Sequence, residues 1–176
     1  MNTFHATKNL SRIAIVTSLT LALNCPAPAL AASSSDTLAV SATVAATCTV
    51  AGNTLAFGIY SGQLIDASTT IAVTCTNTTT YSVALSSGAH AGSGGGEGRA
   101  NRRMAGPGAA RLAYALFNNS GRTTEWTSDA GEGGQGLVSG TGNGAAQLLT
   151  IYGRLTAAQY VTPGSYSDTV TATVTY

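Results

Sequence analysis

The sequence predicts an all-β protein whose strands pack as a β-sandwich, and three observations support this fold class. Apolar and polar residues alternate with a period of two through much of the chain after residue 31, as in strands with one buried face. No stretch of ten or more residues there keeps apolar residues at helical spacing. Turn-forming residues separate the alternating stretches, which is typical of sandwiches of immunoglobulin-like size.

The first part of the chain, residues 1–31, reads as a secretory signal peptide. Lys8 and Arg12 supply the positive start, residues 13–23 form an apolar run, and residues 29–31 read Ala-Leu-Ala, a small-residue cleavage site. The apolar run is shorter than the roughly 20 residues that a membrane-spanning helix needs. We therefore expect an exported protein without stable membrane insertion.

Removing residues 1–31 from the 176 leaves 145 residues, which is the size of one domain and enough for a hydrophobic core. This part contains two cysteines, Cys48 and Cys75. Because an exported chain meets oxidising surroundings, we expect them to form a disulfide rather than a metal site or a catalytic thiol. In the entropic model, closing the loop between them destabilises the unfolded chain by about 3.6 kcal/mol.

The alternation is clearest at the C-terminus, in residues 166–176. Every odd-numbered position there is serine or threonine, whereas the even-numbered positions include Val170, Ala172, Val174 and Tyr176. This pattern predicts a strand with one buried face. Five further strands are expected at residues 55–60, 69–76, 81–87, 112–117 and 147–155.

Two glycine-rich stretches, residues 88–108 and 118–144, interrupt the strands and predict long surface loops. One helical turn is possible at residues 156–160, before Pro163 and Gly164 turn the chain into the last strand. Four arginines form a local basic cluster that we expect to be solvated: Arg99, Arg102, Arg103 and Arg111.

The N-terminal segment, residues 38–46, is a further alternating stretch that follows the serines at 33–35. Its apolar positions are Leu38, Val40, Ala42, Val44 and Ala46. At roughly 3.3 Å per residue, the segment would make a strand about 30 Å long. Such a strand must bury its apolar face, because exposure invites aggregation. The residues alone leave two fates open: an ordinary edge strand of its own sandwich, or a strand given to a neighbouring chain.

Seven motifs carry a resemblance to a known family. They are CTV at 48–50, LAFGIY at 55–60, IAVTC at 71–75, RM at 103–104, LAYAL at 112–116, the lone Trp126, and PGSYSDTV at 163–170. In this order they resemble the spore coat protein U domain family, which includes the archaic, Csu-type pilins of the chaperone-usher pathway. The chain departs from the family pattern in its glycine-rich loop at 88–108 and in Thr127, where glycine is expected.

The resemblance implies a pilin-type, immunoglobulin-like sandwich, residues 48–176, that lacks its final strand and so has a hydrophobic groove. Residues 32–47 would be an N-terminal extension whose donor strand is Leu38, Val40, Ala42, Val44 and Ala46. A periplasmic chaperone would fill the groove first, and the donor strand of the next subunit would replace it at an outer-membrane usher. The last strand, with Val170, Ala172, Val174 and Tyr176, would border the groove.

The partners so implied are identical or related pilin subunits, a periplasmic chaperone and an outer-membrane usher. Subunits joined head to tail by a contact that does not close make a filament. The expected function is therefore that of a structural subunit of a surface fimbrium, exported through the periplasm, that supports adhesion and biofilm formation.

The composition argues against catalysis and against nucleic acid as a partner. Without Lys8 and Arg12, six of the eight basic residues remain against seven acids, so the processed chain is nearly neutral. Its one histidine, His90, has no acid or cysteine beside it in the sequence, and no Gly-x-Ser-x-Gly motif presents a serine. We expect no catalytic residue, no cofactor and no metal, because too few ligands remain once the cysteines pair.

Three rival functions remain open at this point. The first is a spore or cell-coat structural protein that uses the same domain without a pilus. The second is a noncatalytic carbohydrate-binding surface module, with a loop at Trp126 as the binding site. The third is a weak glycosidase whose carboxylates would come from Glu125, Asp129 and Glu132 beside that tryptophan.

Overall fold

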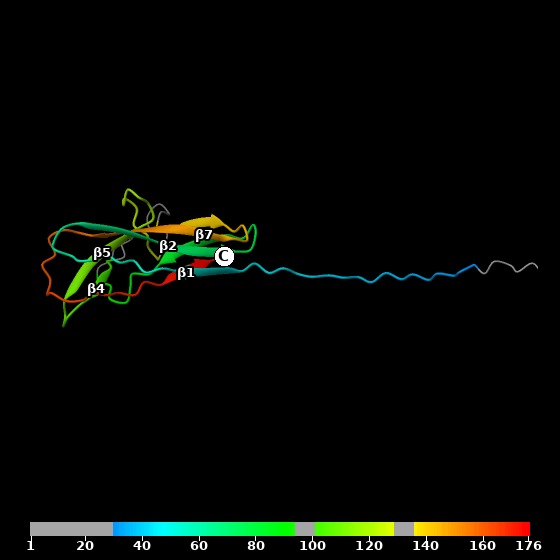
Figure 1. Cartoon of the computed structure of the whole chain (residues 1–176), viewed down its shortest axis with the longest axis horizontal. Coiled ribbons are helices and arrows are strands. Elements are labelled where there is room, and N and C mark those ends of the chain that lie inside the picture. The colour runs from blue at the N-terminus through cyan, green and yellow to red at the C-terminus, as the bar shows by residue number, and fades with distance from the viewer. Residues whose placement is uncertain (1–29, 94–100, 129–135) are drawn as a thin grey trace, which may run out of the picture. The chain divides into compact units, whose positions relative to one another are not determined.

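The computed structural model describes residues 30–93, 101–128 and 136–176 (Figure 1). Nearly all of the expected signal peptide therefore lies outside the described residues. The chain divides into two compact units, Met1–Ser41 and Ala42–Tyr176. The second unit holds all the strands described below.

The described residues form eight β-strands and no helix. The strands are β1 (Cys48–Gly52), β2 (Ile65–Cys75), β3 (Thr80–Leu85), β4 (Arg103–Ala105), β5 (Arg111–Phe117), β6 (Val138–Thr141), β7 (Ala146–Leu155) and β8 (Ala172–Thr175). One sheet has the order β1-β2-β7-β5-β4, whose strands are labelled in Figure 1, and the other has the order β6-β3-β8. Every pair is antiparallel. The predicted fold class, an all-β sandwich, is confirmed.

Within the described residues, no helix is long and apolar enough to cross a membrane.

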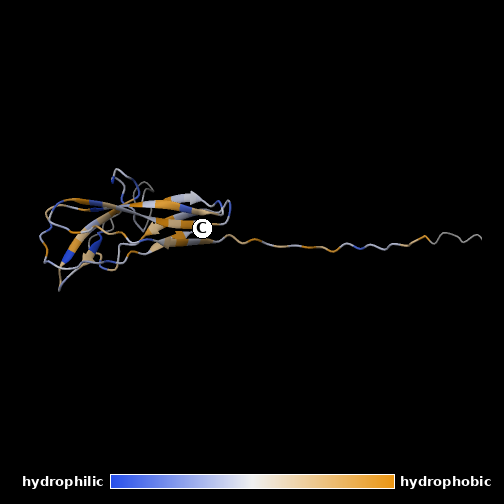
Figure 2. Cartoon of the chain, in the orientation of Figure 1, coloured by the Kyte–Doolittle hydropathy of each residue, from blue (hydrophilic) through white to orange (hydrophobic). Residues whose placement is uncertain are grey.

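The core is built from side chains that alternate along the strands and face inward. Hydrophobic residues recur along β2, β5 and β7 (Figure 2). The buried set is Ile71, Val73, Cys75, Tyr81, Val83, Leu85, Leu112, Tyr114, Leu116, Trp126, Ile151 and Leu155. Burying one such aliphatic side chain stabilises the fold by about 1.5 to 3 kcal/mol. The period-two pattern thus marks the inward face of these strands.

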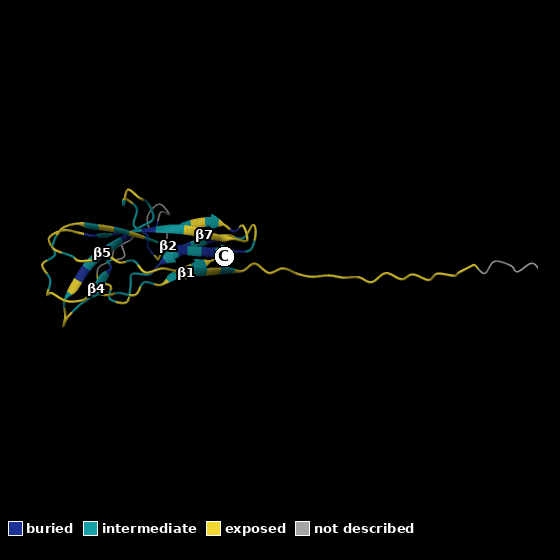
Figure 3. Ribbon diagram, viewed as in Figure 1, coloured by how far each residue is buried: buried dark blue, intermediate teal, exposed yellow. Residues whose placement is uncertain are grey.

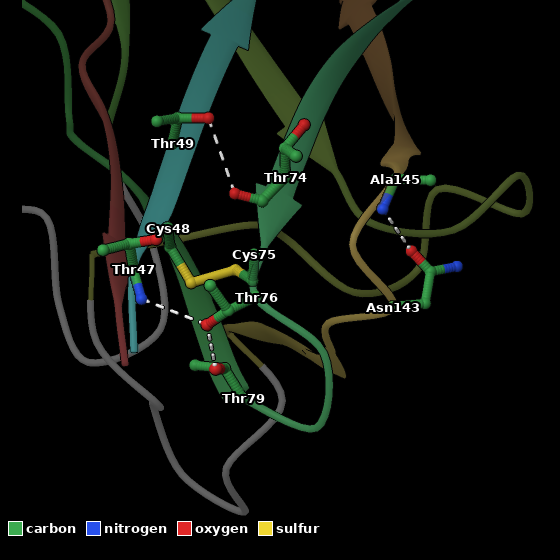
Figure 4. Close-up of a disulfide and its surroundings, with 9 residues drawn as sticks. All are labelled: Thr47, Cys48, Thr49, Thr74, Cys75, Thr76, Thr79, Asn143 and Ala145. Atoms are coloured by element: carbon green, nitrogen blue, oxygen red, sulfur yellow. Dashed lines mark hydrogen bonds between the residues drawn. A yellow bond between two sulfur atoms is a disulfide. The ribbon is translucent and has the colours of Figure 1, made fainter. Parts of the chain in front are cut away.

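The disulfide joins Cys48, the first residue of β1, to Cys75, the last residue of β2 (Figure 4). The two residues are direct partners in the antiparallel register, and the predicted disulfide is confirmed. The ladder continues one residue further, since Thr76 N donates to Thr47 O at 2.9 Å and Thr47 N donates to Thr76 Oγ1 at 3.1 Å. The start of β1 is therefore fixed both covalently and by hydrogen bonds.

Two expected elements are absent from the structure. No strand forms at residues 55–60, where Gly58 adopts a left-handed conformation with φ 77°, which departs from the extended backbone of a regular strand. No helical turn forms at residues 156–160, where Ala158 is also left-handed with φ 65°. The side chain of Gln159 instead hydrogen-bonds to the backbone of Ala113.

The prediction of two long loops is wrong in part, because each glycine-rich stretch contains a short strand. β4 lies within the stretch 88–108, and β6 lies within the stretch 118–144. Each pairs with a longer strand, β4 with β5 and β6 with β3. Pairing with a partner distant in the sequence therefore overrides the local preference of glycine-rich sequence for loops.

The prediction that the arginine cluster is solvated is wrong for Arg102, which is only 1% exposed. Its Nη2 donates to Leu85 O at 2.9 Å and to Trp126 O at 2.7 Å, and its Nε donates to Ser86 O at 2.9 Å. The guanidinium thus satisfies backbone carbonyls at the end of β3. Arg99, from the same cluster, lies outside the described residues.

Candidate functional site

Two strand edges without a ladder partner come close together in the described part of the chain. β1 is the outer strand of the five-stranded sheet and pairs only with β2, and β8 is the outer strand of the other sheet and pairs only with β3. Cα atoms of β1 and β8 approach within 8 Å of one another. Each free edge carries backbone donors and acceptors, so one more strand can pair here.

The C-terminal segment, residues 166–176, uses one set of its backbone groups and leaves the other free. Ser86 N donates to Thr171 O at 2.9 Å, and Ala89 N donates to Thr169 O at 3.0 Å. Because successive residues of a strand direct their backbone groups to opposite sides, the even-numbered residues face away from β3. The backbone groups available to an added strand are those of Val170, Ala172 and Val174.

The predicted groove-edge residues lie at this edge. Val170, Ala172 and Val174 are half-buried and pack against the core, whereas Thr171 and Thr173 between them are exposed. Tyr176, the last residue, is 58% exposed. The strand expected at 166–176 is shorter in the structure, because only Ala172–Thr175 pairs with β3. Ser167 makes an isolated bridge to Ala105.

An open cleft lies beyond the end of β1 and before the start of β8. Its smaller part, of about 330 Å³, lies between residues 52–55 on one side and residues 168–172 on the other. Its larger part, of about 800 Å³, lies between residues 56–62 and residues 159–166. Met104 lines both parts, which therefore share one wall.

The walls of the larger part are apolar and aromatic. Phe57 and Tyr166 are half-buried against the core, while Ile59 and Tyr160 are each 92% exposed. Apolar surface left in water costs about 25 cal/mol per Å² relative to burial, and exposed patches of this kind mark interaction sites. The cleft therefore exposes apolar side chains that a further layer of side chains would cover.

A buried carboxylate lies on the wall of the smaller part. The side chain of Asp168 is 2% exposed; the Tyr114 hydroxyl donates to its Oδ2 at 2.7 Å, and His90 Nδ1 lies 3.0 Å from its Oδ1. Burial, and then the bond to Asp168, raise the pKa of Tyr114 above its ordinary value. The hydroxyl thus stays protonated and fastens β5 to the segment that borders the cleft.

Sequence reasoning missed this contact, because Asp168 is 78 residues from His90 and nothing in the sequence joins them. A histidine oriented by a carboxylate is one half of a nucleophile-activating arrangement. Among the described residues, however, no serine, threonine or cysteine side chain hydrogen-bonds to His90. Since His90 N also donates to Asp168 Oδ1 at 3.2 Å, the pair links His90 to the segment that leads into β8.

The N-terminal segment, residues 38–46, forms no strand in the structure and is exposed along its whole length (Figure 3). The side chains of Leu38, Val40 and Val44 are 88%, 86% and 86% exposed, and Ala42 and Ala46 are exposed as well. The segment forms no ladder with any described strand, and its apolar side chains are exposed. Which surface covers them stays a prediction.

The rival hypothesis of a sugar-binding platform at Trp126 is wrong, because this side chain is 0% exposed and donates from Nε1 to Val83 O at 2.9 Å. Of the candidate glycosidase carboxylates, Glu125 lies 3.4 Å from Arg102 Nη1. Asp129 and Glu132 lie outside the described residues. Within residues 30–93, 101–128 and 136–176, no group of three or more His, Cys, Asp or Glu side chains could hold a metal ion.

The sequence of this sandwich is similar to those of known proteins. The family model of the Spore Coat Protein U domain matches residues 34–173. Protein U of Myxococcus xanthus is 29% identical over 162 residues, which cover 85% of this chain and 88% of that protein.

A solved structure, the chaperone-tip adhesion subunit pre-assembly complex CsuC-CsuE from the archaic chaperone-usher Csu pili of Acinetobacter baumannii, contains a similar chain. The TM-score is 0.52 at 21% identity over 76% of this chain, which spans 40% of the length of that one. At this identity the likeness concerns the fold. With most of its length matched by the family model, the chain belongs to the Spore Coat Protein U domain family.

Proposed function

We propose that this chain is a structural, noncatalytic subunit of a surface fimbrium, assembled by the chaperone-usher pathway through donor-strand complementation. The observation that carries the proposal is the open cleft that adjoins two unpaired strand edges, in a chain that also has an alternating segment outside the ladders. In this proposal residues 1–31 direct export, residues 32–47 form the N-terminal extension, and residues 48–176 form the incomplete sandwich. The fimbrium serves adhesion and biofilm formation at the cell surface.

The N-terminal segment and the cleft match in length and chemistry. Residues 38–46 make a strand of about 30 Å, and the acceptor edge at residues 166–176 is about 36 Å long when extended. The apolar face of the segment suits the aromatic and aliphatic walls of the cleft. Its backbone can pair with the free groups of Val170, Ala172 and Val174, which is recognition by strand addition.

The partners follow from the same chemistry. A periplasmic chaperone covers the cleft of each newly exported subunit, and an outer-membrane usher exchanges it for the N-terminal segment of the next subunit. The fold shared with a chain of a chaperone-tip adhesion subunit complex supports this assignment. Because the donating and accepting surfaces differ, the contact does not close on itself and builds a filament.

A charge placed on the apolar face of the N-terminal segment tests the proposal. In Val44→Asp, a carboxylate would enter an apolar cleft without a partner, which is strongly unfavourable. Thr43→Asp puts the same charge on the opposite face and is the matched control. Each full-length variant is co-expressed with its chaperone and usher, and unheated gels are read for oligomer ladders. We expect ladders for the wild type and Thr43→Asp only; a normal ladder for Val44→Asp would contradict donation through this segment.

A second candidate is a spore or cell-coat protein that polymerises without a pilus. The match to Protein U over 88% of that protein's length favours it. The two candidates differ in their need for an usher. If purified polymer forms to the same extent in cells that lack the usher, the coat assignment replaces the fimbrial one.

A further inference from the structure

We infer that the outer face of the sheet β6-β3-β8 binds an uncharged saccharide through a group of free hydroxyls. The site goes beyond the proposed function and does not depend on it, although repetition along a fimbrium would strengthen its binding. It is separate from the cleft, because no residue that lines the cleft also lines this site.

The register of the sheet brings five hydroxyl-bearing side chains together on this face. Thr80 is the direct partner of Thr141. Ser82 is the direct partner of Ser139 on one side and of Thr175 on the other. The apolar residues that alternate with them along the strands face the core. Strand geometry therefore places the five hydroxyls outward, about 5 Å apart between strands and about 7 Å apart along a strand.

These five hydroxyls have no internal use in the fold. None of them makes a hydrogen bond to another residue in the part of the chain that the structure describes. Hydroxyls elsewhere do: Thr76 Oγ1 lies 2.6 Å from Thr79 Oγ1, and Ser86 Oγ accepts from Thr171 N at 2.9 Å. Each free hydroxyl offers one donor and two acceptor sites, so the face presents a dense, regular set of hydrogen-bonding groups to a ligand.

An open hollow of about 590 Å³ lies over this group, and its lining is completed by Tyr81, Gly140 and Tyr176. Tyr81 is only 5% exposed and Gly140 has no side chain, so these two residues give the hollow a floor of backbone. Tyr176 is 58% exposed and supplies an aromatic ring. The volume falls within the range of about 300 to 1,000 Å³ that is typical of small-molecule sites.

The lining of the hollow indicates an uncharged, hydroxyl-rich ligand. No charged side chain is among the described residues that line it, so a charged ligand would lose water there without gaining an ion pair. Sugar hydroxyls donate and accept hydrogen bonds in the same way as those of serine and threonine. The apolar face of the Tyr176 ring can cover the C–H face of a pyranose. A neutral saccharide matches both kinds of group.

An open site of this kind holds one saccharide weakly, because much of the ligand stays in contact with water. In a fimbrium the site would recur on every subunit. Linked sites bind a polymeric ligand about 10²-fold or more tightly than one site does. We therefore expect weak binding by the monomer and strong binding by the fibre.

Amide NMR of the isotope-labelled, processed chain tests the site. Trisaccharides of mannose, glucose and galactose are the neutral probes, and trigalacturonate is the charged probe of the same size. We expect at least one neutral probe to shift the signals of residues 80–82, 139–141 and 175–176, and the charged probe to leave them unchanged. The inference is wrong if no neutral probe shifts these signals or if the charged probe shifts them equally. Shifts that follow protein concentration instead would assign the face to a second copy and overturn it.

Removal of two facing hydroxyls tests their part in binding. Thr80→Val with Thr141→Val keeps the branched shape that strands favour. The matched control, Thr49→Val with Thr74→Val, changes a direct cross-strand pair in the other sheet. We expect the dissociation constant of the best neutral probe to rise at least about tenfold in the first variant and to stay unchanged in the control. Equal affinities in the two double variants would contradict the inference.

A change at the last residue tests the aromatic contact with little effect on folding. Tyr176→Ala should weaken binding of the same probe by about fivefold. Tyr160→Ala, at a tyrosine that is 92% exposed and lines the cleft, is the control and should bind like the wild type. If Tyr176→Ala also binds like the wild type, the ring has no part in the site and the inference is wrong. A chain that binds a neutral probe here yet never forms oligomer ladders would refute the fimbrial function and leave this inference standing.

Discussion

The Tyr114 hydroxyl donates a 2.7 Å hydrogen bond to Oδ2 of Asp168, and this bond joins the middle of β5 to the segment that leads into β8. Both residues line the smaller part of the cleft. The side chain of Asp168 is 2% exposed, and a buried carboxylate needs hydrogen-bond donors in place of water. The bond therefore holds one wall of the cleft to the body of the sandwich, and its removal should be measurable.

Replacing Tyr114 by phenylalanine removes this donor and should lower the free energy of unfolding by about 1 to 3 kcal/mol at neutral pH. The pKa of Tyr114 is raised in the folded state above its ordinary value of 10.0, mainly by burial. The stability it contributes is therefore fully present below pH 10 and is lost as the pH rises towards the folded-state pKa. Urea unfolding of the processed chain from pH 8 upward measures both effects.

Tyr176→Phe, at a tyrosine that is 58% exposed, is the control for this measurement. It should retain the alkaline loss of stability seen in the wild type, whereas Tyr114→Phe should show a flatter profile above pH 10. Equal slopes in the two variants would mean that Tyr114 does not carry this pH dependence.

Arg102→Leu should destabilise the fold by about 3 kcal/mol or more, because it removes a buried cation together with donors to three backbone carbonyls. Arg102→Lys keeps the charge but loses the planar fork that reaches all three carbonyls. We expect it to fall between the wild type and Arg102→Leu in thermal unfolding. A leucine variant as stable as the wild type would show that these hydrogen bonds contribute little.

Removal of the disulfide by Cys48→Ala with Cys75→Ala should lower the free energy of unfolding by about 3.6 kcal/mol, the value that the entropic model gives for this loop. Guanidinium unfolding of the processed chain measures the loss. Reduction of the wild type with a thiol is the matched comparison, and its midpoint should approach that of the double variant. A midpoint unaffected by either treatment would exclude a stabilising disulfide.

Gly153→Val should deform the wall of the cleft. A Cβ atom at this position would lie 2.6 Å from Leu55 Cδ2 and 2.8 Å from Phe57 Cζ, so the side chains of Leu55 and Phe57 must shift. We expect uptake of a synthetic peptide of residues 36–46 to weaken by about tenfold or more and stability to fall by about 1 to 3 kcal/mol.

Gly121→Ala controls for the loss of a glycine, since its Cβ would meet only ordinary contacts at 3.6 and 3.8 Å. It should take up the peptide as the wild type does. If Gly153→Val matches this control in peptide uptake, the wall at Leu55 and Phe57 does not contact the incoming strand.

The sequence predicts those features that depend on which face of a strand is buried. Alternation at residues 112–117 and 147–155 corresponds to β5 and β7, and the disulfide follows from two cysteines in an exported chain. The same alternation misleads at residues 55–60, where Leu55 and Phe57 are half-buried without a ladder. A period of two reports burial of one face and does not reveal whether a hydrogen-bonding partner is present.

Features that depend on distant contacts were not predictable. Arg102 is buried because the carbonyls of Leu85 and Trp126 converge on it, and these residues are 17 and 24 positions away. Asp168 and His90 are further apart still, at 78 positions. Short strands such as β4 carry too few residues for a pattern, so their existence follows from the neighbouring strand rather than from their own sequence.

The position of the disulfide has a mechanical consequence for a fibre. Tension arriving from a neighbouring subunit would enter the sandwich through Ala46 and Thr47, directly before Cys48. From there the sulfur-sulfur bond transmits part of the load to β2, a strand flanked by β1 and β7 on its two sides. Separating β1 from β2 at this end would then require breaking a covalent bond as well as hydrogen bonds. The outer strand of the sheet would therefore resist being pulled away under load.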